Sequence, residues 1–305
     1  MPPHWSVSDL RQRVPGHSLV DELLRQWDLG TIRLDGDRVV IDDEAVSWYR
    51  GVLGERRVAS VLQSLDDRWT VLHSVPVGKG TTDIDHVVIG QSGVFTINTK
   101  YSPGKEVWVA GRGMYVGGHK QPYVHNSLRE AKRAAELLSD TTGLTVPVTA
   151  LIVFVDPAKL THKAAAGAGD FEPAVRVIRD TEILATIRTR PIFNPEQTAR
   201  IVDAAVQATT WQASPAPSTK GSHITGEFAA LESALGTHLA GPLTRGPQPS
   251  ARPAAGTKSR PVRGPRPTRR GRAKKSRLEK LVWDLAFPIA GFAIAWAVVQ
   301  SFIAK

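Results

Sequence analysis

The sequence predicts an α/β fold with a mixed central sheet flanked by helices, and three observations support this class. Residues 148–155 form a continuous apolar run of strand length, which is typical of a strand inside a sheet. Residues 83–89 and 94–100 are strand-like runs joined by a short glycine-bounded turn, which predicts a hairpin. Helical patterns at 46–65 and 126–138 precede and follow these strands, and such helices cover the faces of a sheet.

The other elements follow from the same periodicities. Further strands are predicted where β-branched or aromatic runs are bounded by Gly, Pro or polar residues, at 69–75, 106–109, 113–116 and 175–178. Further helices are predicted where the apolar spacing is helical, at 19–27, 181–187, 195–211 and 223–239. A β-hairpin is expected at 32–41. This order gives a mixed sheet rather than a doubly wound one.

Composition divides the chain into four parts. Residues 1–45 are an N-terminal leader, and residues 46–212 form the globular domain that contains the predicted sheet. Residues 213–280 are rich in Ala, Pro and Arg, and most of this linker cannot bury enough apolar surface to offset the entropy lost on ordering. We therefore expect the linker to be largely disordered. The fourth part, residues 281–304, is apolar.

The formal net charge of +10 suggests a nucleic-acid-binding protein, but the charge is unevenly placed. Residues 241–280 contain 13 of the 39 Lys and Arg residues and one of the 29 acidic residues, so the rest of the chain has a formal charge of −2. The globular domain is therefore close to neutral. We expect the basic linker to contact an anionic membrane surface.

The chain contains no cysteine. Disulfides, zinc–thiolate sites and thiol catalysis are therefore excluded. Any metal ion would be bound by oxygen or imidazole ligands, which favours a hard ion such as Mg²⁺.

The apolar fourth part is long enough to cross a membrane. Residues 285–304 carry no charge, and as a helix they would span about 30 Å, the thickness of the hydrocarbon core. Four basic residues precede this segment directly: Lys274, Lys275, Arg277 and Lys280. We therefore predict a single transmembrane helix at 281–304 in the cell membrane, with the N-terminal domain in the cytoplasm. The alternative is a buried core helix, although such a helix seldom follows a long Arg- and Pro-rich linker.

Polar residues gather at the ends of the predicted hairpin strands. Alternate side chains of a strand share a face, so Asp83 and Asp85 point to one side, and His86 points to the other. Asn98 and Lys100 likewise share one side of the next strand. If the strands pair through their connecting turn, Asp85, Asn98 and Lys100 face a common pocket. His86 is then expected to be a core histidine.

This arrangement suits metal-dependent phosphodiester cleavage. Asp85 would bind a divalent ion, which lowers the pKa of a bound water molecule and stabilises charge on the phosphate. Lys100 would orient or deprotonate that water, or neutralise the transition state. The alternative is a solvated strand face on which Asp85 and Lys100 form a weak cross-strand pair.

Glu55 is a further candidate acid. It precedes Val58 by three residues and Leu62 by seven, so helical spacing places it on the apolar face of its helix. A carboxylate there must be paired, capped or bound to a cation. The alternative is a position at the start of the helix, marked by Gly54, where the helix dipole would stabilise the charge.

Taken in order, these residues resemble the NERD (nuclease-related) domain, a family similar to the PD-(D/E)xK endonucleases. The residues that carry the resemblance are Gly54-Glu55, the run 83–89, Gly93-Val94-Phe95, Thr99-Lys100 and the helix after Gln121-Pro122. The resemblance covers roughly residues 50–160 and implies a restriction-endonuclease-like sheet flanked by helices. It also implies that Glu55, Asp85 and Lys100 take the catalytic positions of the family.

The chain departs from the family pattern at Asn98, because the family commonly has Glu-x-Lys at this point. An amide oxygen binds a hard cation less strongly than a carboxylate does. Either a displaced acid, Glu55 or Asp83, restores the ligand charge, or the site has lost its metal and its activity.

The leading hypothesis is a membrane-tethered nuclease-like protein that hydrolyses phosphodiester bonds of DNA with Mg²⁺, with RNA as the other nucleic-acid substrate. The predicted catalytic residues are Asp85, Lys100 and Glu55, and the predicted metal ligands are Asp85, Glu55, Asn98 and Asp83. Phosphate contacts are expected from Arg56, Arg57 and Lys79. The alternative is a catalytically inactive domain that binds nucleic acid or a protein partner at the membrane.

Overall fold

The computed structural model describes residues 9–35, 38–41, 43–78, 82–110, 113–163, 175–213 and 221–239. All of these belong to one unit, residues 1–244. The basic part of the linker and the expected transmembrane segment at 281–304 lie outside the described residues. Among the helices that are described, none is both long enough and apolar enough to cross a membrane.

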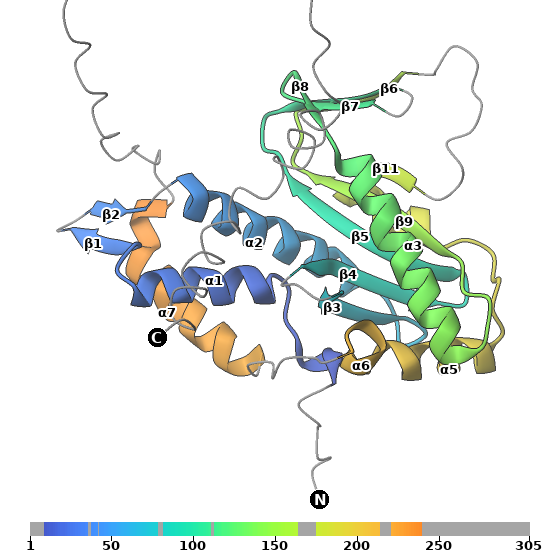
Figure 1. Cartoon of the computed structure of the whole chain (residues 1–305). Helices are drawn as coiled ribbons and strands as arrows, with labels where there is room; N and C mark the ends of the chain where they lie inside the picture. The colour runs from blue at the N-terminus through green and yellow to red at the C-terminus, as the bar shows by residue number, and fades with distance from the viewer. Residues whose placement is uncertain are drawn as a thin grey trace, which may run out of the picture. The chain divides into compact units, whose positions relative to one another are not determined.

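A five-stranded sheet forms the centre of this unit, in the order β11–β9–β5–β4–β3 (Figure 1). Its strands are β3 (Thr70–Pro76), β4 (Asp83–Gly90), β5 (Gly93–Tyr101), β9 (Val148–Val155) and β11 (Val175–Arg179). Strands β3, β4 and β5 are antiparallel, whereas β5, β9 and β11 are parallel. The predicted mixed sheet and its β4–β5 hairpin are therefore confirmed.

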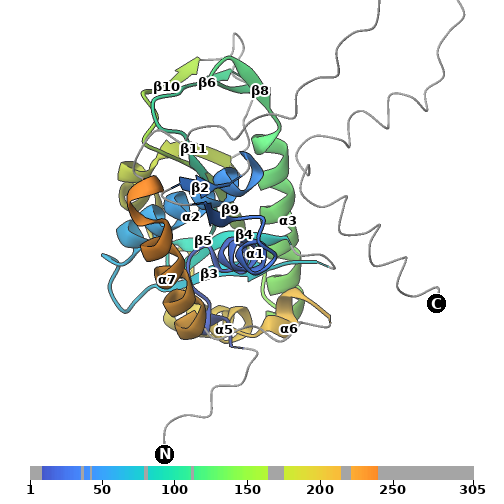
Figure 2. The same cartoon turned by 90° about the vertical axis from the view of Figure 1, so that its left-hand side faces the viewer.

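Helix α2 (Asp43–Leu62) covers one face of this sheet (Figures 1 and 2). It buries Val58 and Leu62 against the sheet. A Cβ atom at Gly54 would lie 3.0 Å from Cβ of Tyr101, so the glycine allows the helix to approach the end of β5 closely. This close approach brings the polar residue that follows the glycine to the end of the sheet.

Helix α3 (Tyr123–Thr142) covers the opposite face (Figures 1 and 2). Its small and apolar residues Ala134 and Leu138 pack into the core on that side. The helix ends at Gly143, which has a φ of +68° and donates its N–H to the carbonyl of Ser139 (2.8 Å). A left-handed glycine is a common way for a helix to end.

A second, four-stranded sheet has the order β10–β6–β7–β8. Its strands are β6 (Glu106–Ala110), β7 (Gly113–Val116), β8 (His119–Gln121) and β10 (Lys159–Lys163). Strands β6 and β7 are the predicted short pair, whereas β8 and β10 are not apparent in the sequence. Strand β10 is polar and forms because it pairs in parallel with β6, about fifty residues earlier in the chain.

The first and last described helices pack together. α1 (His17–Asp28) and α7 (Gly221–Leu239) share a core to which α7 contributes Ile224, Phe228 and Leu231. Beside them, β1 (Arg33–Asp35) and β2 (Arg38–Val40) form the predicted two-stranded hairpin. Composition placed α7 in the linker, but its apolar residues recur at helical steps and attach it to the folded unit.

Two predicted helices are divided in the structure. The expected helix at 195–211 consists of α5 (Pro195–Ala205) and α6 (Ala208–Trp211). Between them the carbonyl of Val206 accepts a hydrogen bond from the N–H of Leu10 (2.9 Å), so the leader interrupts the helix. The expected helix at 181–187 consists of the 3₁₀ turn η2 (Asp180–Glu182) and α4 (Ile183–Ile187). A second 3₁₀ turn, η1 (Leu10–Gln12), lies in the leader.

Candidate functional site

The predicted hairpin residues lie where β4 leaves β5. The register of the two strands runs from Gly90↔Gly93 to His86↔Ile97. One residue further, Oδ2 of Asp85 accepts a hydrogen bond from the backbone N–H of Thr99 (2.6 Å). The carboxylate therefore takes the place of a backbone partner at the point where the ladder of this hairpin stops.

Helix α3 adds an acid that the sequence analysis missed. Nδ2 of Asn98 donates to both carboxylate oxygens of Glu130, at 3.3 and 3.2 Å. Glu130 follows the buried Ser127 by three residues and precedes the buried Ala134 by four, so it lies on the stripe of α3 that faces the sheet. This spacing is the signal that could have revealed it.

The carboxyl groups of Asp85 and Glu130 lie in one poorly solvated cluster. Burial raises the pKa of Asp85 to about 6, with Asp83 adding to the effect, while Lys100 and the Thr99 N–H oppose it. Burial also raises the pKa of Glu130 to about 7, and the carboxylate of Asp85 raises it further. Each group therefore favours its neutral form because water is excluded and other carboxylates are near.

Glu55 extends the same cluster from the α2 side. It is 6% exposed, and its Oε2 accepts a hydrogen bond from the backbone N–H of Gly16 (2.8 Å). Burial raises the pKa of Glu55 well above its usual value, and the nearby carboxylates of Asp85 and Asp83 raise it further. The alternative position at a helix start is wrong, because α2 begins at Asp43 and Glu55 lies in its interior.

The N-terminal leader supplies a cation to this cluster. A terminal guanidinium nitrogen of Arg13 lies 3.7 Å from Oδ2 of Asp83, and Nε of Arg13 donates to the carbonyl of Ser74 (2.6 Å). Burial raises the pKa of Asp83, whereas Ser18 and Arg13 lower it. Nothing in the leader's composition indicated this contact, because Arg13 reaches the site only through the fold.

Lys100 is the second cation of the cluster. Its Nζ lies 4.8 Å from the centre of the Tyr123 ring, at the start of α3. Within the described residues, Lys100 forms no ion pair at 4.0 Å or less, so the expected Asp85–Lys100 pair is not a direct contact. Lys100 still lowers the pKa of Asp85 through space, which shows that the two charges are neighbours.

The structure thus brings together all five predicted site residues: Glu55, Asp83, Asp85, Asn98 and Lys100. It adds Glu130 and Arg13. When every group is ionised, four carboxylates face two cations, so the cluster carries an excess of two negative charges. Such an excess in a buried site favours the uptake of protons or of a cation.

Two of the three basic residues expected to contact phosphate, Arg56 and Arg57, form ion pairs within the protein. Arg56 pairs with Glu232 of α7 (2.9 Å) and lies over the ring of Phe228, 4.6 Å from its centre. Arg57 pairs with Asp180 (2.9 Å). Lys79 lies outside the described residues.

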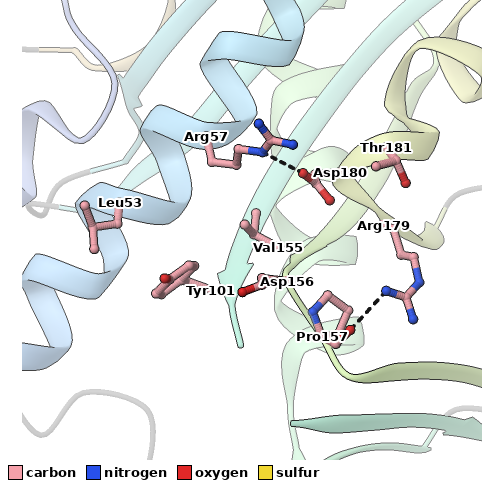
Figure 3. A pocket seen from close by; sticks show the side chains of 9 residues that line it. All are labelled: Leu53, Arg57, Tyr101, Val155, Asp156, Pro157, Arg179, Asp180 and Thr181. Atoms are coloured by element: carbon pink, nitrogen blue, oxygen red, sulfur yellow. Dashed lines mark hydrogen bonds and ion pairs between the residues drawn. The ribbon is translucent and has the colours of Figure 1, made fainter. Parts of the chain in front are cut away.

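A pocket of about 510 Å³ lies at the carboxyl ends of the parallel strands, on the α2 side (Figure 3). Tyr101 and Arg57 line it, and Arg57 donates from Nε to Asp180 (2.9 Å). Arg179 donates from a terminal nitrogen to the carbonyl of Pro157 (3.0 Å). The charged side chains of this pocket balance, since Arg57 and Arg179 face two aspartates. It therefore lacks the excess charge of the carboxylate cluster.

The donor atoms of the carboxylate cluster fit a hard divalent ion. Oδ1 of Asn98 is buried and has no hydrogen-bond partner among the described residues, although it lies beside a carboxylate. Such an orphaned oxygen accepts a cation readily. In the described part of the chain, however, no three His, Asp or Glu side chains stand together in a metal-binding group. An amide oxygen would thus have to complete any ligand set.

Comparison with known proteins agrees with the resemblance seen in the sequence. Residues 50–155 match the family model of the nuclease-related domain, NERD. The chain therefore contains a nuclease-related domain, and this domain includes Glu55, Asp83, Asp85, Asn98, Lys100 and Glu130.

Two further proteins are similar to parts of the chain. An uncharacterized protein of Bacillus anthracis is 40% identical over 70 residues, a match of 22% of this chain and 32% of that protein. The match thus spans about a third of that relative. The structure of SfsA from Pyrococcus furiosus, in complex with Ca²⁺, shares 17% sequence identity over 48% of this chain and 60% of that chain, with a TM-score of 0.24.

Proposed function

We propose that the nuclease-related domain hydrolyses phosphodiester bonds of DNA with the help of Mg²⁺, with RNA as the other possible nucleic acid. The observation that carries this proposal is the contact between Asn98 and Glu130. It places a carboxylate beside the position where the family commonly has one on the strand. Glu130 of α3 would therefore supply the negative charge that Asn98 lacks.

The residues divide into two groups by their partners. Glu55 accepts a hydrogen bond from the N–H of Gly16, and Asp83 lies beside Arg13, so both acids already have a partner from the leader. Asp85, Glu130 and the amide oxygen of Asn98 remain on the α3 side and would hold the ion. When bound, Mg²⁺ would lower the pKa of a water molecule and stabilise charge on the phosphate.

Lys100 would act on the phosphate. Its ammonium group lies at the end of β5, over the ring of Tyr123, and forms no ion pair at 4.0 Å or less with a described carboxylate. A cation held at a fixed place can stabilise the negative charge that develops on a phosphate in the transition state. Tyr123 therefore serves as a positioning residue for Lys100.

The proposal is tested by nicking of supercoiled plasmid with the full-length protein in Mg²⁺ or Mn²⁺. Asp85→Asn, Lys100→Ala and Glu130→Gln should each reduce nicking strongly. The double variant Asn98→Glu/Glu130→Gln moves one carboxylate from α3 to β5 and should recover part of the activity. Glu136→Gln is the matched control, since Glu136 lies on the same helix with a half-exposed side chain. Equal nicking by the wild type and all three single variants would refute the proposal.

A second candidate function is a catalytically inactive domain that binds nucleic acid or a protein partner. It is favoured by the amide at position 98 and by the absence of a ready group of three His, Asp or Glu ligands in the described chain. Calorimetric titration with Mg²⁺ separates the two functions. No heat of binding at millimolar Mg²⁺, together with no nicking, would establish the inactive domain.

We further propose that the domain acts at the inner face of the cell membrane. The support is the uncharged segment 285–304 and the 13 basic residues of 241–280, which would lie against anionic lipid. Membrane fractionation of cells that express the full chain tests this. Recovery of the protein in the soluble fraction would contradict the tether without affecting the nuclease proposal.

A further inference from the structure

The four-stranded sheet carries an aromatic row on its outer face. The register places Trp108 of β6 opposite Thr161 of β10 on one side and Tyr115 of β7 on the other. Tyr115 in turn lies opposite Lys120 of β8. Residues in register across a sheet point to the same face, so these four side chains form one continuous row across all four strands. We call these four residues the aromatic row.

The inner face of the same sheet packs into the hydrophobic core of the protein. Val107, Val109, Met114 and Val116 alternate with the outward residues and are buried in a core shared with α3. The outward side chains are not needed for that core. Trp108 is 40% exposed, which is unusual for a large aromatic side chain on a strand. Its ring lies 5.4 Å from that of Tyr115, at an angle of 45°.

The surroundings of the aromatic row are basic. Lys105, Lys120 and Lys159 are exposed on this sheet and on the turn that leads into it, and the exposed acids near them are Glu106 and Asp156. This local excess contrasts with the near-neutral charge of the chain outside the basic linker. An exposed and a half-buried ring between lysines match a ligand with flat π-faces and a repeated negative charge.

We propose that the aromatic row of the small sheet stacks the bases of a single-stranded nucleic acid. The bases of a single strand present their faces, whereas a duplex hides them in its stack. The two rings lie on neighbouring strands with their centres 5.4 Å apart, so the row would stack up to two bases. Lys120, at one end of the row, would contact the phosphate backbone.

The position of the small sheet connects this surface to the carboxylate cluster. β6 begins five residues after Tyr101, the last residue of β5, and β8 is separated from α3 by Pro122 alone. β5 carries Lys100, and α3 carries Glu130. The small sheet therefore follows β5 and precedes α3 in the chain, and it lies next to the end of β5 and the start of α3 (Figure 1). The inference rests on the proposed function. It deepens that function by naming single-stranded nucleic acid as the substrate.

Binding of a fluorescein-labelled oligothymidylate to the full-length protein tests the inference. Anisotropy is measured in EDTA, so that no cleavage is needed, and at roughly 0.3 M salt, where nonspecific binding by the basic linker is weak. Trp108→Ala/Tyr115→Ala should weaken binding at least tenfold, because it removes both rings on which the bases would stack. Trp108→Phe keeps a ring and should retain most of the affinity. Ile192→Ala removes an exposed apolar side chain elsewhere and should have no effect.

Three outcomes would overturn the inference: no binding of the oligonucleotide by the wild type, equal binding by Trp108→Ala/Tyr115→Ala, or equally tight and equally impaired binding of a blunt duplex. Circular dichroism of each variant shows whether it is folded. Plasmid nicking separates the two proposals. Normal nicking with no stacking would refute this inference alone, and Trp108-dependent binding without any nicking would refute the catalytic proposal alone.

Discussion

Two neighbouring residues of β4, Asp85 and His86, lie on opposite faces of one strand and meet opposite environments. Asp85 joins a cluster of four carboxyl groups at the point where β4 separates from β5, with Glu55 reaching it from α2 and Glu130 from α3. His86 is fully buried on the other face of the strand, and its Nδ1 lies 2.9 Å from Nδ1 of His73. One imidazole must donate in this contact and the other accept, whereas Nε2 of His86 is buried with no hydrogen-bond partner among the described residues.

Burial acts on both residues in the same way, by favouring the neutral form, but it shifts their pKa values in opposite directions. It raises the pKa of Asp85 to about 6 and lowers the pKa of His86 well below its usual value. Two neutral imidazoles need no outside charge. Four ionised carboxyl groups with two cations do, and this difference supports our proposal that a metal ion binds beside Asp85.

The largest expected effect concerns catalysis. Asp85→Asn should reduce plasmid nicking by on the order of a hundredfold or more, because it removes a charged ligand beside the phosphate site. His73→Gln, on the histidine side of the same sheet, should leave nicking within a few-fold of the wild type. The rates are compared at pH 8, once circular dichroism has shown that both variants are folded. A strong loss in His73→Gln with none in Asp85→Asn would reverse the assignment of the two faces.

The next effect concerns stability. Substitutions of His86 and of Glu130 should change the free energy of unfolding in opposite directions. His86→Ala should lower the free energy of unfolding by about 2–4 kcal/mol, since it leaves a cavity and an unpaired His73. Glu130→Gln should raise the free energy of unfolding by about 1–3 kcal/mol at pH 8, because a buried carboxylate with a raised pKa is removed. Urea denaturation in EDTA measures both. Destabilisation by Glu130→Gln would show that its charge is compensated in the protein without metal.

The pH dependence of stability should differ between the faces in a predictable way. The pKa of Glu130 rises from 4.5 to about 7 on folding, so the folded protein binds the proton more tightly and stability falls as pH rises from about 4.5 to 7. The pKa of His73 falls from 6.5 to about 4, so stability falls as pH drops from about 6.5 to 4. Each pKa unit corresponds to about 1.4 kcal/mol.

These opposing slopes can be separated with variants. Glu130→Gln should reduce the first slope and leave the second, and His73→Gln should do the reverse, since Asp85 and His86 still contribute to the first and second slopes respectively. Urea unfolding at half-unit steps of pH from 4 to 8 gives both curves. A wild-type slope that neither variant changes would mean that other groups, such as the buried His17, control it.

The smallest expected effect is the response to Mg²⁺ itself. Millimolar Mg²⁺ should raise the melting temperature of the wild type by a few degrees, because it binds the folded state and relieves the carboxylates. The shift should grow between pH 6 and 8, as Asp85 and Glu130 lose their protons. Glu130→Gln should abolish it, and the exposed control Glu136→Gln should not. An equal shift in both variants would place the ion elsewhere.

Much of the fold was predictable because its signals are local. The apolar run of β9, the turn between β4 and β5 and the periodicity of α2 and α3 each lie within one stretch of chain, and all are confirmed. β10 was not predictable, because its polar residues form a strand only through pairing with β6. The break between α5 and α6 likewise depends on Leu10, which is distant in the sequence.

For the site, alternation on β4 and β5 and the family resemblance were enough to predict that Glu55, Asp83, Asp85, Asn98 and Lys100 belong to one cluster. These residues follow from strand period and motif order, which the sequence by itself determines. Only the tertiary structure decided that Glu130 contacts Asn98, that Arg13 reaches Asp83, and that Asp85 and Lys100 are not in direct contact. The physical reason is that charge balance in a buried site depends on groups from α3 and from the leader, and their approach is set by packing rather than by spacing along the chain.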